Sequence, residues 1–181
     1  MTFQIEKTIQ ACAVLFKETG QMSRLRLLKL LYIADRESLQ EVGNSITGDR
    51  AVAMDHGPVL SRTYDIIKGE EHGVERWSQF IARVGRRDLR LKTDPGVDAL
   101  SAYEVEKLQE VANRFDASDG WEVVEKTHEF PEWQRNRPPG RSSKEIPFEH
   151  ILEAVGMADH AAEIIADSES FARIGRVLAL L

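Results

Sequence analysis

The segment from Ser23 to Gly43 constrains the fold most, because it predicts a long helix that is apolar on nearly every side. Ser23 can cap the start of this helix, and Gly43 can end it. Its first half carries the apolar residues Leu25, Leu27, Leu28, Leu30, Leu31, Ile33 and Ala34. A helix with so little polar surface is normally surrounded by other elements. The sequence therefore predicts a fold built around one central helix.

The same helix carries a few polar residues in a regular pattern. Lys29, Tyr32 and Arg36 lie at positions i, i+3 and i+7, so they share one stripe of the helix, and Asp35 lies beside them. Polar groups on an otherwise apolar helix need hydrogen-bond partners when they are buried. The stripe therefore indicates either internal hydrogen bonds or a partner-binding groove.

The remaining segments predict a mainly helical α+β domain. Helices are expected over residues 3–17, 58–67, 103–115, 120–126, 147–155 and about 159–180, with Pro58 in the first turn of the second of these. A strand is expected over 50–54 and a hairpin over 77–92, and together they would form a small antiparallel sheet of two or three strands. We read the 181 residues, of which 42% are hydrophobic, as one compact domain with its C-terminal helices in 146–181.

The cysteine count and the N-terminus favour a cytoplasmic protein. Cys12 is the single cysteine of the sequence, so neither an intrachain disulfide nor a thiolate metal cage can form. Cys12 falls on the apolar stripe of the first predicted helix, which indicates a core residue. The N-terminal residues lack a signal-peptide pattern, and no apolar run approaches the roughly 18 residues that span a bilayer.

The charge distribution argues against a protein that coats nucleic acid. The formal net charge is −6, whereas binding along a phosphate backbone needs a net or clustered positive field. Two basic clusters nevertheless occur, at Arg83, Arg86, Arg87, Arg90 and Lys92 and at Arg135, Arg137, Arg141 and Lys144. Solvated loops explain both clusters. A DNA-binding regulator that uses Arg86, Arg87 and Arg90 in the hairpin segment 83–92 is the alternative.

The sequence contains no recognisable catalytic, metal or cofactor motif. The five histidines, His56, His72, His128, His150 and His160, show no spacing that would put two metal ligands on one face. A Gly-x-Ser-x-Gly elbow and the glycine-rich phosphate loops are also missing. We therefore expect no enzyme activity, no catalytic residue, no metal site and no cofactor.

Four segments in a fixed order resemble the SocA-like, or Panacea, antitoxin domain. They are Leu28–Arg36, Ile46–Arg50, Met54–Val59 and Tyr64–Ile67. The resemblance is strongest from Leu27 to about Gly69, and the best-matching core spans 23–133. It continues more weakly to the helix at Ile146.

This resemblance implies a function. Panacea domains are small, mostly helical folds that neutralise toxins of many unrelated kinds encoded in the same operon, and one member also delivers its toxin to the ClpXP protease. The implied function is that of an antitoxin that binds a cognate toxin directly, with delivery to a ClpXP-type protease as a further expectation. Because many antitoxins repress their own operon, operator DNA is the alternative partner.

The resemblance also implies where the partner binds. Carried over by position, and with the neighbouring Arg50 added, it gives the candidates Lys29, Tyr32, Asp35, Arg50, His56, Tyr64, His128 and Trp133. A structural role is the alternative for several of them. Tyr64 and Trp133 can be core aromatic residues, and Asp35 and His56 can be buried, hydrogen-bonded polar groups.

Overall fold

The computed structural model describes residues 2–140 and 142–166. In chain order the elements are α1 (Ile5–Thr19), β1 (Met22–Ser23), α2 (Arg24–Val42), β2 (Ala51–Met54), β3 (Gly57–Leu60), α3 (Ser61–Lys68), α4 (Val74–Phe80), β4 (Ile81–Val84), β5 (Asp88–Leu91), α5 (Ala102–Arg114), α6 (Gly120–His128), α7 (Pro131–Asn136), β6 (Lys144–Glu145), α8 (Phe148–Ala154) and the 3₁₀ helix η1 (Ala158–His160). Helices predominate and the strands are short and antiparallel, so the predicted mainly helical α+β class is confirmed.

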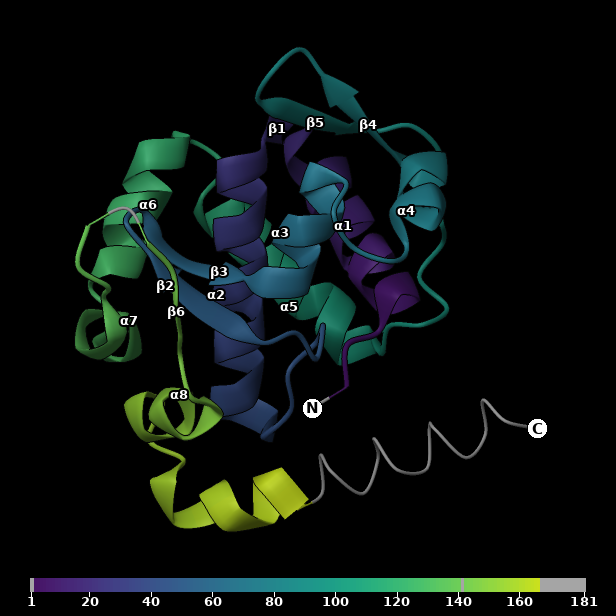
Figure 1. Ribbon diagram of the computed structural model, residues 1–181. Coiled ribbons are helices and arrows are strands. Elements are labelled where there is room, and N and C mark those ends of the chain that lie inside the picture. The colour runs from purple at the N-terminus through teal and green to yellow at the C-terminus, as the bar shows by residue number, and fades with distance from the viewer. Residues whose placement is uncertain (1, 141, 167–181) are drawn as a thin grey trace.

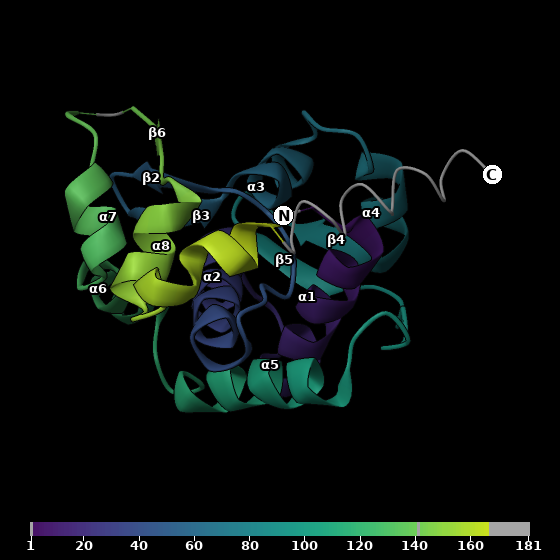
Figure 2. The ribbon, with the colours of Figure 1, turned by 90° about the horizontal axis from the view of Figure 1, so that it is seen from below.

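Helix α2 lies at the centre of the molecule, as predicted (Figure 1). It contacts α1, α3, α5, α6 and α8, and it also contacts strands β1 and β3. Seen from below, α5 lies along one side of α2 and the group α6, α7 and α8 along another (Figure 2). The buried part of α2 runs from Leu27 to Asp35 without interruption and resumes at Ser38 and Leu39. The apolar character of the segment is thus explained by neighbours on all sides.

Residues close in sequence mark the two ends of α2 and the starts of α5 and α6. The Ser23 side chain accepts a hydrogen bond from the Arg26 amide, and Gly43 ends α2 in the left-handed conformation. Ser101 and Glu104 form a capping box at the start of α5, and Asp119 and Glu122 form another at the start of α6. These hydrogen bonds join residues a few positions apart, so they depend mainly on the local sequence.

The predicted single sheet is wrong, because the structure contains two separate three-stranded sheets in the described residues. One sheet has the strand order β1-β5-β4 and the other has the order β3-β2-β6. The hairpin therefore pairs with Met22 and Ser23, and strand 51–54 pairs instead with Gly57–Leu60 and with Lys144–Glu145. Both sheets include a strand of only two residues, which is too short to be recognised in the sequence.

The predicted helix start at Pro58 is also wrong, because Gly57–Leu60 forms strand β3. Pro58 pairs with Ala53, and β3 is an edge strand of its sheet, where a missing N–H is tolerated. Helix α3 begins instead at Ser61. Its start is capped by Asp49, which accepts hydrogen bonds from the amides of Arg62 and Thr63 at 3.1 and 2.8 Å.

Two further segments are helical where no helix was predicted. Residues 74–80 form α4 in place of part of a hairpin arm, because Val74 and Trp77 lie at helical spacing and pack into the core. Residues 131–136 form helix α7, which has Pro131 in its first turn. The hairpin is correspondingly shorter and spans 81–91.

The C-terminal part agrees with prediction as far as the structure describes it. Helix α8 matches the expected helix 147–155 to within a residue at each end. The 3₁₀ helix η1 is followed by helical residues 161–166. The rest of the helix predicted to residue 180 lies outside the described residues.

The core is formed by buried apolar side chains from both sheets and the surrounding helices. Cys12 is fully buried in it, as predicted, and burial raises the pKa of its thiol. None of the described helices is both long enough and apolar enough to cross a membrane.

Gly57 gives a test of the packing between β3, α2 and α6. Its φ is +90°, and a Cβ placed there would lie 2.5 Å from Thr127 Oγ1 and 3.0 Å from Lys29 Nζ. Gly69 has a φ of +92° but no atom within 4 Å of such a Cβ, so it is a matched control for the backbone strain. We expect Gly57→Ala to lower the free energy of unfolding by about 1–3 kcal/mol more than Gly69→Ala does, measured in urea. Equal losses of unfolding free energy in the two variants would show that Gly57 is not in tight contact with Thr127 and Lys29.

Candidate functional site

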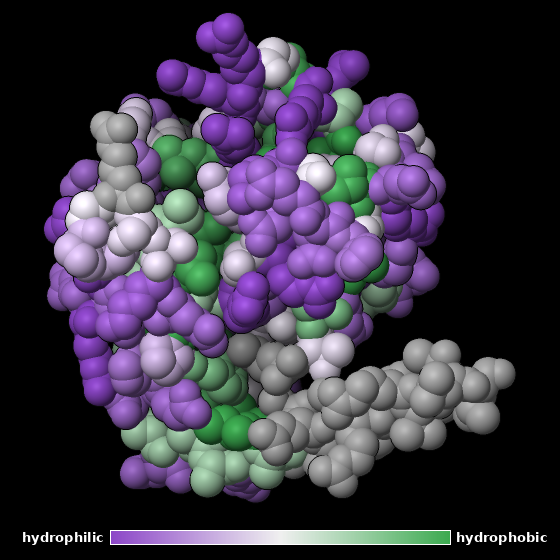
Figure 3. All heavy atoms as spheres, in the orientation of Figure 1, coloured by the Kyte–Doolittle hydropathy of each residue, from purple (hydrophilic) through white to green (hydrophobic). Residues whose placement is uncertain are grey.

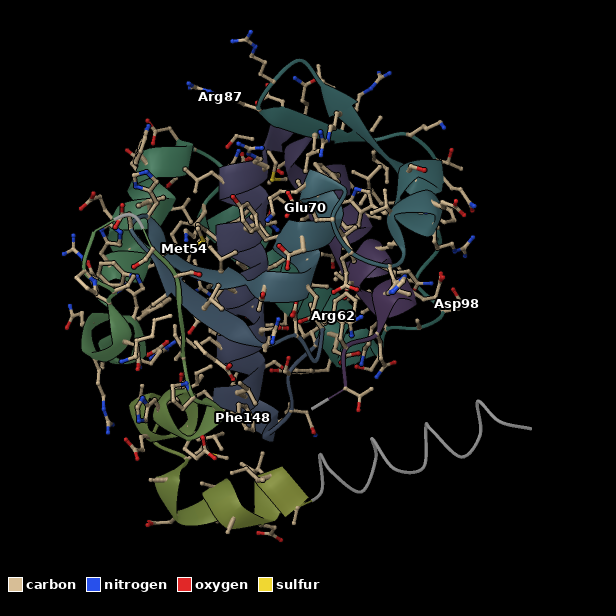
Figure 4. All side chains as sticks on the ribbon, in the orientation of Figure 1. Met54, Arg62, Glu70, Arg87, Asp98 and Phe148 are labelled. Carbon is tan, nitrogen blue, oxygen red and sulfur yellow. The ribbon has the colours of Figure 1, made fainter. Side chains whose placement is uncertain are left out.

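A groove of about 910 Å³ opens where segments far apart in the sequence meet. Its walls come from the first turns of α2, the β2–β3 turn, the start of α6 and the turn of the β4–β5 hairpin. Figure 4 labels two of its residues, Met54 on β2 and Arg87 at the hairpin turn. On the face drawn in Figure 3, hydrophobic surface is exposed below the hydrophilic side chains that project at the top. We call the 910 Å³ groove the α2–α6 groove.

The walls of the α2–α6 groove are largely apolar. They are formed by Leu25, Leu28, Met54, Val59 and Trp121. Trp121 stands out because 56% of its surface is exposed, although it is the largest type of apolar side chain. Solitary exposed apolar residues are ordinary, but an exposed tryptophan beside an apolar groove is typical of a binding surface.

Lys29 is a buried residue of α2 that lines the groove. Its relative exposure is 0%, and its Nζ donates a 2.6 Å hydrogen bond to the carbonyl oxygen of Pro58. No carboxylate of the described part of the chain forms an ion pair with it, and burial lowers its pKa from the ordinary 10.5 to about 7. Lys29 is therefore a buried amine that changes charge near neutral pH.

His56 and Tyr64 also line the groove. His56 is exposed at the β2–β3 turn and meets the Trp121 ring edge-on, with ring centroids 5.1 Å apart and an interplanar angle of 88°. Tyr64 is half-buried, and its ring lies 4.8 Å from the ammonium of Lys68. The structure thus brings together three of the predicted partner residues, Lys29, His56 and Tyr64.

Charged groups of both signs surround the groove. Arg24 and Arg87 are exposed, and their guanidinium groups form no ion pair or hydrogen bond with the residues that the structure describes. The carboxylates are mostly engaged: Asp88 accepts a hydrogen bond from Gln21, and Asp119 caps α6. Asp55 has no such partner within the described ranges. The groups free to meet a partner are therefore mainly cationic.

Three other predicted residues make internal hydrogen bonds and lie outside the groove. Tyr32 Oη donates to Glu132 at 3.0 Å, and Trp133 Nε1 donates to the carbonyl oxygen of Met54 at 2.9 Å. Asp35 accepts hydrogen bonds from the amide and hydroxyl of Thr47, and burial raises its pKa to about 6. These residues hold the fold together and do not line the α2–α6 groove.

The last two predicted residues lie elsewhere. His128 is half-buried and stacks on Trp133 with ring centroids 4.3 Å apart, and burial lowers its pKa. Its Nε2 is buried without a hydrogen-bond partner among the described residues. Arg50 is exposed, but it does not line the groove, and its carbonyl oxygen accepts from the Ser61 amide.

The hairpin arginines do not form one surface. Arg87 lines the α2–α6 groove, whereas Arg90 lines a second recess of about 510 Å³ together with Arg83 and Lys92. Arg86 is exposed at the turn between the strands. The cations proposed for DNA binding are therefore divided between two hollows.

Residues 27–134 match the model of the family described as antitoxin SocA-like, Panacea domain. The chain belongs to this family. No curated protein and no solved structure matches it. Membership supports a general antitoxin role and suggests a non-enzymatic one. Within residues 2–140 and 142–166, no group of three or more His, Cys, Asp or Glu side chains could hold a metal ion.

The Panacea match covers most of the groove but not all of it. Lys29, Met54, His56 and Trp121 fall inside the matched range, whereas Arg24 and Leu25 lie before it. Sequence reasoning missed Trp121 as a site residue, because it was considered only as part of helix 120–126. Its position directly after the cap Asp119 and Gly120 places it on an exposed first turn, which is the signal that could have identified it.

Replacing Lys29 tests whether its burial costs stability. The pKa of Lys29 is lower in the folded chain than in the unfolded chain, so the unfolded chain binds more protons between about pH 7 and 10. Lys29 therefore destabilises the fold less as pH rises through that window. Lys29→Met lacks this dependence. We expect the variant to be more stable than the original chain at pH 7, and the difference to shrink by up to about 1.4 kcal/mol per pH unit toward pH 9.

The measurement is urea unfolding at several pH values. Lys17→Met is the matched control, because the Lys17 side chain is 40% exposed and pairs with Asp94 at the surface. Its difference from the original chain should stay constant over the same range. A constant difference for Lys29→Met as well would mean that Lys29 is not buried as a lone amine.

Proposed function

We propose that this Panacea protein acts in the cytoplasm and neutralises a toxin encoded in the same operon by binding it directly in the α2–α6 groove. The observation that carries the proposal is the clustering of Lys29, His56 and Tyr64 beside the exposed ring of Trp121. The first three belong to the pattern that the family resemblance singles out. Trp121 provides the large apolar anchor that protein interfaces commonly bury.

The groove suits a segment of a protein better than a small molecule. Its 910 Å³ lies at the upper end of the range for small-molecule pockets, and it is open to solvent. Its mixture of apolar walls and charged edges resembles the core and rim of a protein interface. Binding there would cover the toxin surface that enters the groove and would leave the rest of the toxin accessible.

Delivery to a ClpXP-type protease is a separate step that we carry over from the family resemblance alone. A toxin held at one groove keeps other segments exposed, which is compatible with its capture by a protease. The half-life of the toxin in cells with and without the protease distinguishes delivery from simple blocking. An unchanged half-life would leave blocking as the mechanism.

Trp121→Ala tests the groove as the toxin-binding surface. Removing an anchor of this kind typically costs about 2 kcal/mol or more, so we expect affinity for the toxin encoded by the neighbouring gene to fall about 30-fold or more. Growth rescue on co-expression should fail in parallel. The folded chain should keep its stability within about 0.5 kcal/mol, because the side chain is mostly exposed.

Val42→Ala is the matched control for this experiment. Val42 is also an exposed apolar residue, at 48%, but it lies at the opposite end of α2 and does not line the groove. It should bind and rescue like the original chain. If the Trp121→Ala variant binds the toxin as tightly as the original chain, the toxin binds elsewhere on the molecule. If the product of the neighbouring gene is neither toxic nor bound, the antitoxin proposal itself is contradicted.

A DNA-binding regulator is the second candidate function. The observation in its favour is that Arg86, Arg87 and Arg90 are exposed on a hairpin that projects at one end of the molecule (Figure 1). Their guanidinium groups are not engaged in ion pairs within the described part of the chain. The division of Arg87 and Arg90 between two hollows weighs against a continuous DNA-binding surface.

Binding to the promoter DNA of the operon tests this second candidate. If the hairpin reads operator DNA, specific binding should survive raised salt and should weaken with Arg87→Ala, because specific contacts add to the salt-sensitive phosphate term. Arg114→Ala is the control, since Arg114 is ion-paired with Glu37 and Glu110. Weak binding that raised salt abolishes in all variants would rule out the regulator.

A further inference from the structure

Lys29 is a buried amine that forms no ion pair with the residues that the structure describes, and it lines the groove to which we assign toxin binding. We propose that the groove binds an acidic, partly apolar segment of the toxin, and that one carboxylate of this segment pairs with Lys29. This inference rests on the function proposed above and adds the chemistry of the partner to it.

The geometry leaves Lys29 able to accept such a partner. An ammonium has three N–H donors, and the Pro58 carbonyl oxygen is its one hydrogen-bond acceptor in the part of the chain that the structure describes. Gly57 packs against the ammonium, because a Cβ placed at Gly57 would lie 3.0 Å from Lys29 Nζ. Lys29 is 0% exposed in the free protein but is among the residues that line the groove, so a carboxylate would reach its remaining donors by displacing the side chains that cover them.

The walls define what must accompany the carboxylate. Leu28 precedes Lys29 in the chain and Val59 follows Pro58, and both line the groove together with Trp121 and Met54. A purely polar segment would leave this surface poorly covered. An acidic residue next to apolar residues would bury the walls and exclude water from the ion pair, which strengthens it.

The charges at the rim favour the same occupant. Arg24 and Arg87 are exposed and unengaged within the described residues, whereas Asp88 and Asp119 already have hydrogen-bond partners. Asp55, Asp88 and Asp119 are the opposing charges, but two of them are already engaged in hydrogen bonds, whereas, within the described ranges, the two guanidinium groups are not. A carboxylate of an acidic segment would thus find free guanidinium donors at the rim.

Pairing would also make binding depend on pH in a defined way. His128 of α6 interacts electrostatically with Lys29, and also with Glu125, Arg137 and His56. The other titratable and charged groups that line the groove with Lys29 are Asp55 of the β2–β3 turn, Tyr64 of α3, Asp119 at α6, Arg24 of α2, and Arg87 and Asp88 of the hairpin. Lys29 titrates near pH 7 in the free protein. A partner carboxylate raises this pKa, so the pair adds affinity fully below about pH 7 and loses it as pH rises further.

The experiment measures the affinity of the toxin encoded by the neighbouring gene for the full chain and for Lys29→Met. We expect about 30-fold or greater loss in the variant at pH 7, because an unpaired carboxylate is left in the groove. Between pH 7.5 and 9.5, above the ordinary range of histidine, the original chain should lose up to about tenfold in affinity per pH unit more than the variant does. Lys17→Met is the control and should follow the original chain.

Substitutions on the toxin identify the carboxylate. Each toxin Asp or Glu is changed to Asn or Gln, and one of these changes should weaken binding to the original chain but have no effect on Lys29→Met. A second pair of variants, Arg24→Ala and Arg87→Ala, changes only exposed side chains and keeps the proposal testable if Lys29→Met misfolds. Both should slow association and reduce its salt dependence.

Several outcomes would overturn the proposal. If Lys29→Met binds the toxin as tightly as the original chain and with the same pH dependence, the proposed ion pair is ruled out but the antitoxin function is not. A free protein that is dimeric, and that Lys29→Met makes monomeric, would show that a second copy of the chain occupies the groove. Failure of the toxin to bind the original chain at all would instead contradict the proposed function.

Discussion

The fold depends on how α2 satisfies the polar side chains that it carries into the core. Lys29 bonds to β3, Asp35 bonds to the loop at Thr47, and Tyr32 and Arg36 both bond to Glu132 of α7. Each bond ties the central helix to a segment that lies far away in the sequence. A buried polar group without a partner is costly, so these bonds select one arrangement of the surrounding elements. The central helix therefore acts as the organiser of the domain as well as its apolar core.

Sequence reasoning succeeded where the determining interaction was local. The cap of the central helix at Ser23 and its end at Gly43 depend on neighbours within a few residues, and both are present. It failed at β3, because Gly57-Pro58 predicts a helix start whereas Gly57–Leu60 pairs with the preceding strand Ala51–Met54 across a two-residue turn. It failed at α4, because the packing of Trp77 into the core depends on residues distant in the sequence. The groove was out of reach for the same reason. Three of its residues could be singled out from the family pattern, but no local signal places Arg24 or Arg87 beside them.

Lys29 illustrates how stability and binding can oppose each other. An uncompensated buried amine weakens the folded state, and an apolar residue of similar length would fill the same space without that cost. Its hydrogen bond to Pro58 offsets part of the cost and fixes the direction of the side chain. A residue that destabilises the free protein is best explained by a gain elsewhere, and a partner that supplies the counter-ion would provide it. The same reasoning does not apply to Asp35, whose hydrogen bonds to Thr47 are already complete within the fold.

The division between internal and groove residues separates a fixed frame from a variable surface. Tyr32, Asp35 and Trp133, which the family resemblance singles out, are engaged inside the fold and hold this domain in shape. The groove rim is formed instead by Arg24, Arg87 and Trp121, which the resemblance does not single out. Side chains at an exposed rim can change without loss of the internal hydrogen bonds, so the rim can adapt to a partner while the frame stays fixed. On this view Lys29 belongs to both parts, because it is held by the frame through Pro58 and lines the groove.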